Sequence, residues 1–307
     1  MKHKRVFWVL IGNENTGSSR IHGHKVHQAL LRKGIKSKIL KQGNSTLTLK
    51  KKIWMLLFLK KGDLLILQKR KELSLRKLLS LLKFKRVNIA FIDCDLPKCD
   101  DSLVKYFDYI IGTSKNLFQL YQRHHPQKKV RYIPDAVEYF EKKKYIHNKK
   151  AIFFGWLTES RIEKINSLKK LFESLGWEIH TMSNNPQADI KWNDWKKIET
   201  FEIISQYSAS LIAVDDDMLS KYKSSNRVLQ SLAVGNIVLC SDIEAYREVI
   251  VEGENGFICS SALEWKNALN QISDQNKRNK IIERGYETAQ NYTMDKVILK
   301  WIYYLEL

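Results

Sequence analysis

Lys221–Leu239 reads KYKSSNRVLQSLAVGNIVL. Apolar residues recur at helical spacing from Asn226 to Val234, Gly235 stands at the C′ position, and a continuous apolar run follows. A helix that leads through a glycine into a buried strand is the repeating unit of parallel sheets. The stretch therefore predicts a helix over Asn226–Val234 and a strand over Ile237–Cys240 in an α/β domain.

The start of this helix is unusually basic. Ser225 is a suitable N-cap, and Lys221, Lys223 and Arg227 surround it. Cations at a helix N-terminus oppose the helix dipole, a cost that a bound anion removes. Backbone N–H groups and cations together suit a diphosphate, which favours an anion site. The alternative is a solvated basic turn ahead of a buried helix.

The same alternation of short apolar runs and amphipathic segments fills the first half of the chain. The predicted strands are Arg5–Ile11, Lys36–Leu40, Asp63–Leu67, Val87–Ile92, Tyr109–Gly112 and Val130–Ile133. The predicted helices are Arg20–Arg32, with Ser18 or Ser19 as N-cap and Gly34 at C′, then Glu72–Leu82 and Lys115–Arg123.

The second half repeats the alternation after a lysine-rich linker, Glu138–Lys149. The predicted strands are Lys150–Phe154, Trp177–Thr181, Ala209–Val214, Ile237–Cys240 and Gly256–Cys259. The predicted helices are Ile162–Leu175 with Gly176 at C′, Asn226–Val234, Ile243–Val249, Ala262–Ile272, Asn276–Asn291 and Met294–Glu306. Ser241-x-x-Glu244 matches a capping box at the start of the short helix Ile243–Val249.

This pattern predicts two Rossmann-like α/β domains, 1–140 and 150–290, that face each other across a cleft, with a C-terminal helix, 291–307, that packs back on the N-terminal domain. Ligands bind beyond the carboxyl ends of parallel strands, so each domain offers one binding edge. Two such edges suit an enzyme that joins two substrates.

Charge is distributed unevenly between the two halves. Residues 1–150 hold 35 Lys and Arg against 11 Asp and Glu, whereas residues 151–307 hold 18 against 22, which gives +24 and −4 and the net +20. The basic half indicates an anionic partner such as a membrane surface, a lipid pyrophosphate, a charged glycan or nucleic acid, or else a solvated lysine-rich surface. There is no secretory signal, no apolar run of roughly 18 residues and no paired cysteine motif, so we expect a cytoplasmic protein.

Lys221–Phe257 resembles the nucleotide-sugar half of family-4 glycosyltransferases of the GT-B fold. The resemblance rests on the opening stretch, on the REVI-like run Arg247–Ile250 and on the turn Gly253-Glu254-Asn255-Gly256. Phe153-Phe154-Gly155 stands where the family begins its second domain and brings backbone close to the donor phosphates. The resemblance implies a nucleotide-sugar donor bound by Gly155, Lys221, Lys223, Ser225, Asn226, Arg227, Gln230, Glu244, Tyr246 and Glu248.

The N-terminal half resembles the family's acceptor side. A loop that ends in Gly17, Ser18, Ser19 and Arg20 follows the first strand. Shorter motifs follow in the family's order: Gly62-Asp63-Leu64, Asp93-Cys94-Asp95, Thr113-Ser114 and Ile133-Pro134-Asp135-Ala136-Val137. The candidates for a catalytic base, which an inverting transfer needs and a retaining one does not, are His22, His24, Asp93 and Asp95.

Two departures from the family pattern concern the donor. Tyr222 and Gln230 replace the family's two glutamates, and Trp156 replaces its basic residue after the domain-opening glycine. Glutamine still hydrogen-bonds a ribose hydroxyl but carries no charge. Asp-x-Asp triplets hold a divalent ion in the other large glycosyltransferase fold, but Asp215-Asp216-Asp217 and Asp93-Cys94-Asp95 follow strands, where polar loops are expected, so we predict no metal.

The sequence thus predicts a glycosyltransferase that moves a sugar from a nucleotide sugar to an anionic glycan or lipid-linked acceptor in surface polysaccharide or glycoconjugate synthesis. It is expected to use neither cofactor nor metal and to bind no nucleic acid. The basic stretches Lys50–Lys61 and Lys69–Arg86 indicate contact with the anionic inner face of a membrane or with an anionic acceptor. The apolar residues Trp54–Phe58 could add membrane contact, but we favour a place for them in the core. The alternatives are a catalytically silent binding module and a basic nucleic-acid-binding protein.

Overall fold

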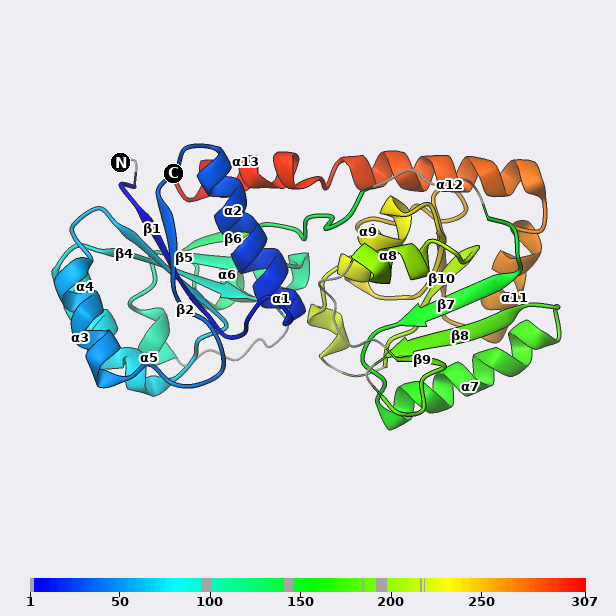
Figure 1. Ribbon diagram of the computed structural model, residues 1–307, viewed down its shortest axis with the longest axis horizontal. Coiled ribbons are helices and arrows are strands. Elements are labelled where there is room, and N and C mark those ends of the chain that lie inside the picture. Colours follow the sequence, from blue (N-terminus) through cyan, green and yellow to red (C-terminus); the bar gives the residue numbers. More distant parts are fainter. Residues whose placement is uncertain are drawn as a thin grey trace. The chain divides into compact units, whose positions relative to one another are not determined.

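The computed structural model describes residues 3–94, 101–140, 146–183, 185–191, 198–215, 217 and 219–307, apart from the side chains of Asp101 and Ile198. The chain forms two compact units (Figure 1). The N-terminal unit comprises Met1–Asp135, Tyr222–Ser224 and Met294–Leu307, and the C-terminal unit comprises Ala136–Lys221 and Ser225–Thr293. Each unit contains a six-stranded sheet in which every pairing is parallel, so the predicted α/β class is confirmed.

The sheet of the N-terminal unit has the strand order β2-β1-β3-β4-β5-β6. Its strands are β1 Val6–Leu10, β2 Ser37–Lys41, β3 Leu64–Gln68, β4 Asn88–Asp93, β5 Tyr109–Gly112 and β6 Lys129–Tyr132. Its helices are α1 Gly17–Ser19, the π-helix η1 Arg20–His24, α2 Lys25–Arg32, α3 Leu49–Phe58, the 3₁₀ turn η2 Leu73–Leu75, α4 Arg76–Phe84, α5 Asp101–Val104, α6 Lys115–His124 and α13 Met294–Tyr304.

Helices cover both faces of this sheet because alternate strand residues point to opposite sides. Phe7 and Val9 of β1 join one core with Met55 of α3 and Leu79 of α4. On the opposite face, Trp8 lies 5.9 Å from the ring of Trp301 in α13. The C-terminal helix α13 therefore packs on the N-terminal unit, where it also contacts α2.

Truncation of Trp301 is expected to destabilise the N-terminal unit. Trp301 is completely buried, and replacing a buried tryptophan with alanine costs about 3–5 kcal/mol. We expect Trp301→Ala to lower the urea midpoint of this unit strongly. Tyr303→Ala on the same helix is the control, because its side chain is exposed and the expected change is within about 0.5 kcal/mol. Equal losses in both variants would mean that α13 is not anchored through Trp301.

The sheet of the C-terminal unit has the order β12-β11-β10-β7-β8-β9. Its strands are β7 Lys150–Phe154, β8 Glu178–Ser183, β9 Ile190–Lys191, β10 Ala209–Ile212, β11 Ile237–Ser241 and β12 Phe257–Cys259. Its helices are α7 Glu159–Glu173, α8 Ile198–Ile204, α9 Asn226–Ala233, α10 Glu244–Arg247, α11 Ala262–Gln271 and α12 Gln275–Gln290; the 3₁₀ turn η3 Ser220–Tyr222 leads out of the unit.

Both strand orders contain a point where the direction of strand addition reverses, which is where α/β proteins bind ligands. In the C-terminal unit this point lies between β7 and β10, and in the N-terminal unit between β1 and β3. The loops that follow these four strands begin at Gly155, Ala213, Ile11 and Lys69. The fold therefore makes these four loops the expected ligand-binding edges of the two units.

Two predicted helix caps are wrong. The first helix begins at Gly17 after Thr16, not after Ser18 or Ser19. Ser241 is the last residue of β11, and α10 begins after Ile243 without a side-chain cap, so Ser241 and Glu244 form no capping box. The hydroxyl of Ser241 instead accepts a hydrogen bond from Val214 N, because the neighbouring strand end presents an amide there.

Candidate functional site

A glycine separates β7 from the loop that leads to α7. Gly155 has a φ of 150°, and a Cβ at this position would lie 2.8 Å from Nη1 of Arg227. Arg227 Nη1 donates to the carbonyl of Phe154 at 3.3 Å. The backbone at Gly155 thus leaves room for the guanidinium of Arg227, and the structure brings together two residues that the sequence assigned to the donor.

A second guanidinium reaches the same loop from the first turn of α7. Arg161 Nη1 donates to the carbonyl of Trp156 at 2.8 Å, and Arg161 Nη2 pairs with Asp215 Oδ2 at 2.5 Å. Arg161 was missed because the helix was predicted to begin at Ile162. Its signal in the sequence was the same as that of Arg227, a cation in the first turn of a helix after a strand.

Tyr246 completes this cluster. It is buried on α10, and Arg227 Nη2 donates to its hydroxyl at 3.5 Å. Burial raises the pKa of Tyr246, while the positive charges of Arg227 and Arg161 oppose that shift. The hydroxyl therefore stays protonated at neutral pH and can donate a hydrogen bond to an anion held by the arginines.

The charge of Arg227 has no counter-ion among the described residues. Its hydrogen-bond acceptors there are a carbonyl and a hydroxyl. Arg161, in contrast, is paired with Asp215. A guanidinium that is half withdrawn from water and has no carboxylate partner is costly. Arg227 is thus the group in this cluster that an anion would neutralise.

The N-terminus of α9 adds donors beside Arg227. The side chain of Ser225, at the N-cap position, makes no capping hydrogen bond, so the predicted cap is correct in position only. The first amides of a helix have no acceptor within it. The buried amide nitrogen of Asn226 and both amide atoms of Gln230 have no partner among the described residues. Asn226 and Gln230 are four residues apart and therefore share one face of α9.

We expect Gln230→Leu to stabilise the protein without ligand and to weaken its response to a nucleotide. Gln230 is 1% exposed, and a buried unpaired polar group costs about 1–3 kcal/mol, which leucine of similar size avoids. The measurement is thermal unfolding with and without UDP. Loss of stability in the ligand-free variant would mean that the amide has a structural partner and serves no ligand.

The remaining donor candidates differ in exposure and in the unit to which they belong. Lys221 and Glu244 are exposed, and Glu248 is half buried and acts electrostatically on Tyr292. Lys223 belongs to the segment Tyr222–Ser224, which packs with the N-terminal unit. The predicted donor segment is therefore divided between the two units.

A cavity of about 230 Å³ opens at the carboxyl ends of β10, β11 and β12. Lys164 of α7 donates to the carbonyl of Val214 at 2.9 Å on its wall. The cavity is adjacent to the arginine cluster through Asp215, the partner of Arg161. Its lining residues are Lys164, Val214, Asp215, Ser241, Asp242, Ile243, Cys259, Ser260 and Trp265.

The turn Gly253–Gly256 has a structural part in this unit. Asn255 Oδ1 accepts from Val251 N at 2.8 Å, and its amide nitrogen donates to Val249 O and Thr288 Oγ1. A Cβ on Gly256 would approach Val238 O to 3.0 Å. The turn thus fixes α10, and with it Tyr246, against the sheet.

In the N-terminal unit, the acceptor-side residues meet at the end of β1. Ser19 Oγ accepts from Gly12 N at 2.9 Å and donates to Gln68 Oε1 at 2.9 Å, and Gln68 Nε2 donates to Ser18 Oγ. The predicted loop residues Gly17, Ser18, Ser19 and Arg20 therefore lie at the reversal point between β1 and β3. Because its hydroxyl is used here, Ser19 does not cap the helix.

Two of the catalytic candidates, His22 and His24, lie on the π-helix η1. His22 Nε2 lies 2.7 Å from Asp135 Oδ1, and both side chains are buried. The second oxygen of Asp135 has no partner among the described residues. His24 Nδ1 lies 3.4 Å from Glu14 Oε1. Asp135 was named only as part of the motif Ile133–Val137, so the sequence analysis did not identify it as the residue that orients His22.

The third candidate, Asp93, is held by several partners. It is fully buried, and its oxygens accept from Cys94 N, from Lys71 Nζ at 2.9 Å and from Tyr121 OH at 2.6 Å. Asp95 and Asp216 lie outside the described residues. Within the described part of the chain no three His, Cys, Asp or Glu side chains gather closely enough to hold a metal ion; independence from metal stays a prediction.

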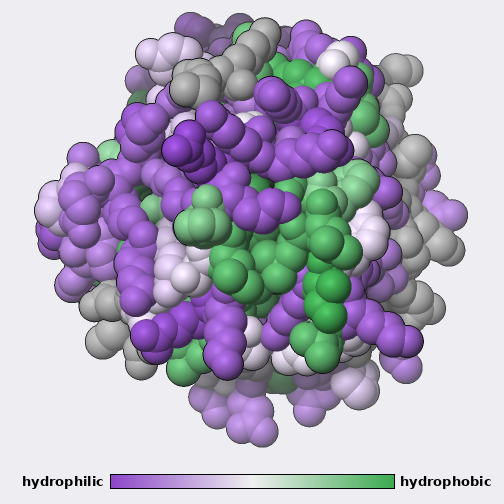
Figure 2. Space-filling model, turned by 90° about the vertical axis from the view of Figure 1, so that its left-hand side faces the viewer, coloured by the Kyte–Doolittle hydropathy of each residue, from purple (hydrophilic) through white to green (hydrophobic). Residues whose placement is uncertain are grey.

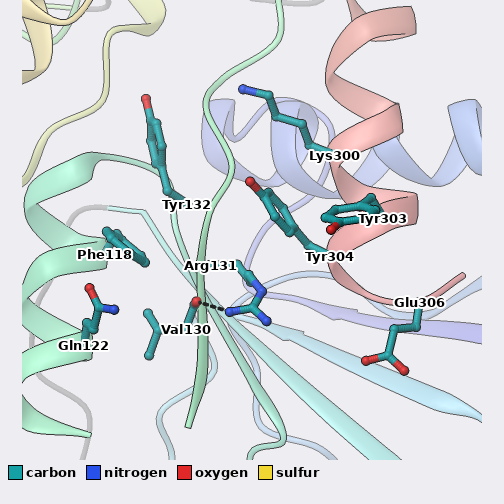
Figure 3. Close-up of a pocket in the computed structure, with 9 residues that line it drawn as sticks. All are labelled: Phe118, Gln122, Val130, Arg131, Tyr132, Lys300, Tyr303, Tyr304 and Glu306. Atoms are coloured by element: carbon teal, nitrogen blue, oxygen red, sulfur yellow. Dashed lines mark hydrogen bonds between the residues drawn. The ribbon is translucent and has the colours of Figure 1, made fainter. Parts of the chain in front are cut away.

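A second cavity, of about 630 Å³, lies beside the edge strand β6 and α13 (Figure 3). Arg131 and Tyr304 face each other in it, with the guanidinium 5.7 Å from the ring centroid. It contains none of the predicted site residues, so we do not assign it to donor or acceptor. Its lining residues are Phe118, Gln122, Val130, Arg131, Tyr132, Lys300, Tyr303, Tyr304 and Glu306.

No model of a known protein family matches the chain, and no curated protein matches its sequence. Solved structures match almost its whole length. One is a glycosyltransferase from Rickettsia africae ESF-5, with a TM-score of 0.74 and 14% identity over 99% of this chain and 98% of that chain. Another is HepE of Anabaena in complex with UDP and glucose, with a TM-score of 0.70 and 10% identity over 99% of each chain. Sucrose-phosphate synthase from Thermosynechococcus elongatus matches with a TM-score of 0.66 and 11% identity over 97% of each chain.

These matches define the fold class of the protein. Two Rossmann-like units in one chain, similar over their full length to solved glycosyltransferases, constitute the GT-B fold. The chain covers 60% of the length of the matched chain in the GtfA/B complex. The fold predicted from Lys221–Phe257 is therefore confirmed.

Proposed function

We propose that the protein is a glycosyltransferase that uses a nucleoside-diphosphate sugar as its donor. The observation that carries this proposal is the guanidinium of Arg227, which lies over Gly155 at the N-terminus of α9 without a carboxylate partner among the described residues. Two arginines, a buried tyrosine hydroxyl and helix N–H groups form a set of donors suited to a diphosphate. The HepE structure, which contains UDP and glucose, supports this assignment by similarity of fold.

The amides of Asn226 and Gln230 suit the hydroxyl groups of such a donor. Each buried amide atom that lacks a partner in the described chain would gain one from a ribose or sugar hydroxyl. Gln230 would bind a hydroxyl group of the donor without adding charge, so the arginines would provide the electrostatic attraction to the diphosphate. The glycosidic bond breaks with the diphosphate as leaving group, whose growing negative charge Arg227 and Arg161 would stabilise.

The acceptor we propose is a hydroxyl of a glycan or of a lipid-linked sugar, bound at the N-terminal unit, and the transfer requires no metal. If the transfer inverts the anomeric centre, His22 takes the proton of that hydroxyl and Asp135 stabilises the resulting imidazolium, since the two side chains are in contact.

A panel of UDP-, GDP- and CMP-sugars tests the proposal. We expect one class to raise the unfolding temperature and to be hydrolysed slowly to the free sugar and the nucleotide, with activity retained in EDTA. Stabilisation without hydrolysis or transfer would indicate a catalytically silent binding module. No stabilisation by any member of the panel would refute donor binding.

A further inference from the structure

An apolar stripe runs along the outer side of α3. Leu49, Ile53 and Leu57 occupy positions i, i+4 and i+8, and their side chains are 73%, 48% and 77% exposed. Met55, on the opposite side of the helix, is fully buried in the core. Because one side of α3 already anchors the helix, the outer stripe is not needed to hold the fold together.

The neighbouring helix α4 extends this apolar surface. Leu81 and Phe84 are 51% and 88% exposed. Lys85, just after α4, donates to the carbonyls of Leu56 and Leu59 at the end of α3. The C-terminal ends of the two helices, which carry Leu57 and Phe84, are therefore close together, and Figure 1 shows α3 and α4 as neighbouring helices.

Basic residues dominate the two segments that carry this apolar surface. Residues 44–62 contain five lysines and residues 73–92 contain five lysines and arginines, and neither segment contains an aspartate or a glutamate. Three acidic side chains next to these segments are paired with cations: Asp63 with Arg5, Asp108 with Lys83, and Glu72 with Arg70. Figure 2 shows a continuous hydrophobic area bordered by hydrophilic residues on the side of the molecule where α3 and α4 lie.

We propose that this α3–α4 face, defined by Leu49, Ile53, Leu57, Leu81 and Phe84 and their basic surroundings, docks on an anionic lipid bilayer. Exposed leucine and phenylalanine side chains enter the boundary between headgroups and acyl chains, while lysines reach the anionic headgroups. Within the described residues no helix has the length and apolar character needed to cross a bilayer. The proposed contact is peripheral.

Charge complementarity decides between this occupant and a second copy of the chain. In a symmetric dimer through this face, two sets of basic side chains without intervening carboxylates would lie against each other, which is unfavourable. An anionic bilayer neutralises the same charges and also accepts the apolar residues. The structure therefore favours a lipid surface, and this choice does not depend on donor binding.

Vesicle flotation tests the proposal with the full-length chain. We expect binding to mixed phosphatidylcholine–phosphatidylglycerol vesicles and little binding to pure phosphatidylcholine. Leu57→Ser with Phe84→Ser should lower the partition coefficient by about tenfold or more, because two exposed apolar anchors are lost. Lys50→Gln, Lys60→Gln and Lys61→Gln together should lower it by about a hundredfold, from roughly fivefold per charge.

Control variants in the C-terminal unit show whether vesicle binding depends on the α3–α4 face or only on the overall positive charge of the protein. Leu263→Ser removes a leucine that is 64% exposed, compared with 77% for Leu57, and Lys266→Gln, Lys277→Gln and Lys280→Gln together remove the same charge as the three lysine substitutions. These controls should bind vesicles like the unaltered protein. Equal losses in controls and test variants, no vesicle binding, or binding to single-stranded oligonucleotides in place of vesicles would overturn the proposal. UDP-induced stabilisation, measured in parallel, shows whether the donor site is intact in each variant.

Discussion

Arg227→Ala is expected to remove most of the thermal stabilisation that UDP gives to the unaltered protein. Hydrogen bonds to charged groups contribute about 1.5–3 kcal/mol each, so the loss of two such bonds to phosphate raises Kd by at least about a hundredfold. At a UDP concentration near one hundred times the original Kd, the stabilisation of about 2.7 kcal/mol would fall to about 0.4 kcal/mol.

The control for this variant is Arg284→Ala. Arg284 is an exposed arginine of α12 in the same unit, so the variant removes the same net charge without touching the cluster at Gly155. It should keep the full response to UDP. A normal UDP response in Arg227→Ala would contradict the donor assignment.

Gly155→Ala provides an independent test of the same contact. The new Cβ would lie 2.8 Å from Arg227 Nη1, and a φ of 150° is strained for any residue with a side chain. The guanidinium must shift, so we expect weaker UDP binding although every donor group is still present. A loss of stability with unchanged UDP affinity would show that the glycine serves the backbone alone.

Much of the fold could be predicted because it depends on local patterns. Gly34, Gly176 and Gly235 were placed after helices, and all three adopt positive φ. The buried strands β3 and β11 are continuous apolar runs, as parallel strands covered on both faces require. These features need no information about residues distant in the sequence.

The two helix caps were predicted wrongly because the hydroxyl groups of the predicted cap residues have partners on other elements of the fold. Ser19 and Ser241 have the right side chains for capping, but Gly12, Gln68 and Val214 engage their hydroxyls in the folded chain. Which of two hydrogen bonds a serine forms depends on which backbone groups the sheet places beside it. A single-sequence pattern contains no such information.

The residues of the candidate site likewise fall into a group that could be predicted from the sequence and a group that could not. Gly155, Arg227 and Tyr246 were predicted, partly through a family resemblance, and they do meet in the structure. Asp135 was missed because its partner His22 is 113 residues away, and Arg161 was missed because the helix that carries it was predicted to begin at the next residue, Ile162. Leu57 was named within Trp54–Phe58 as a candidate membrane contact, whereas the exposure of Phe84 was hidden, since apolar residues on a helix are expected to be buried.

His22→Ala is expected to lower kcat by a factor of about 10² to 10⁴ if the transfer inverts the anomeric centre, because this is the usual contribution of a general base. Nε2 of His22 faces Asp135, so in the neutral imidazole Nε2 carries the proton. Nδ1 is then the atom that takes the proton from the hydroxyl of the sugar acceptor. UDP-induced stabilisation should be unchanged, since no donor-binding group is altered.

Asp135→Asn distinguishes a catalytic histidine from a structural one. Without the carboxylate, the imidazolium that forms during proton transfer loses its stabilising charge at 2.7 Å, so kcat should fall while UDP-induced stabilisation stays unchanged. His27→Ala removes a half-buried histidine of α2 that is bonded to Ser37; it is the control and should leave kcat unchanged. Full activity in His22→Ala would exclude it as the base and favour a retaining transfer, in which the acceptor hydroxyl needs no protein base.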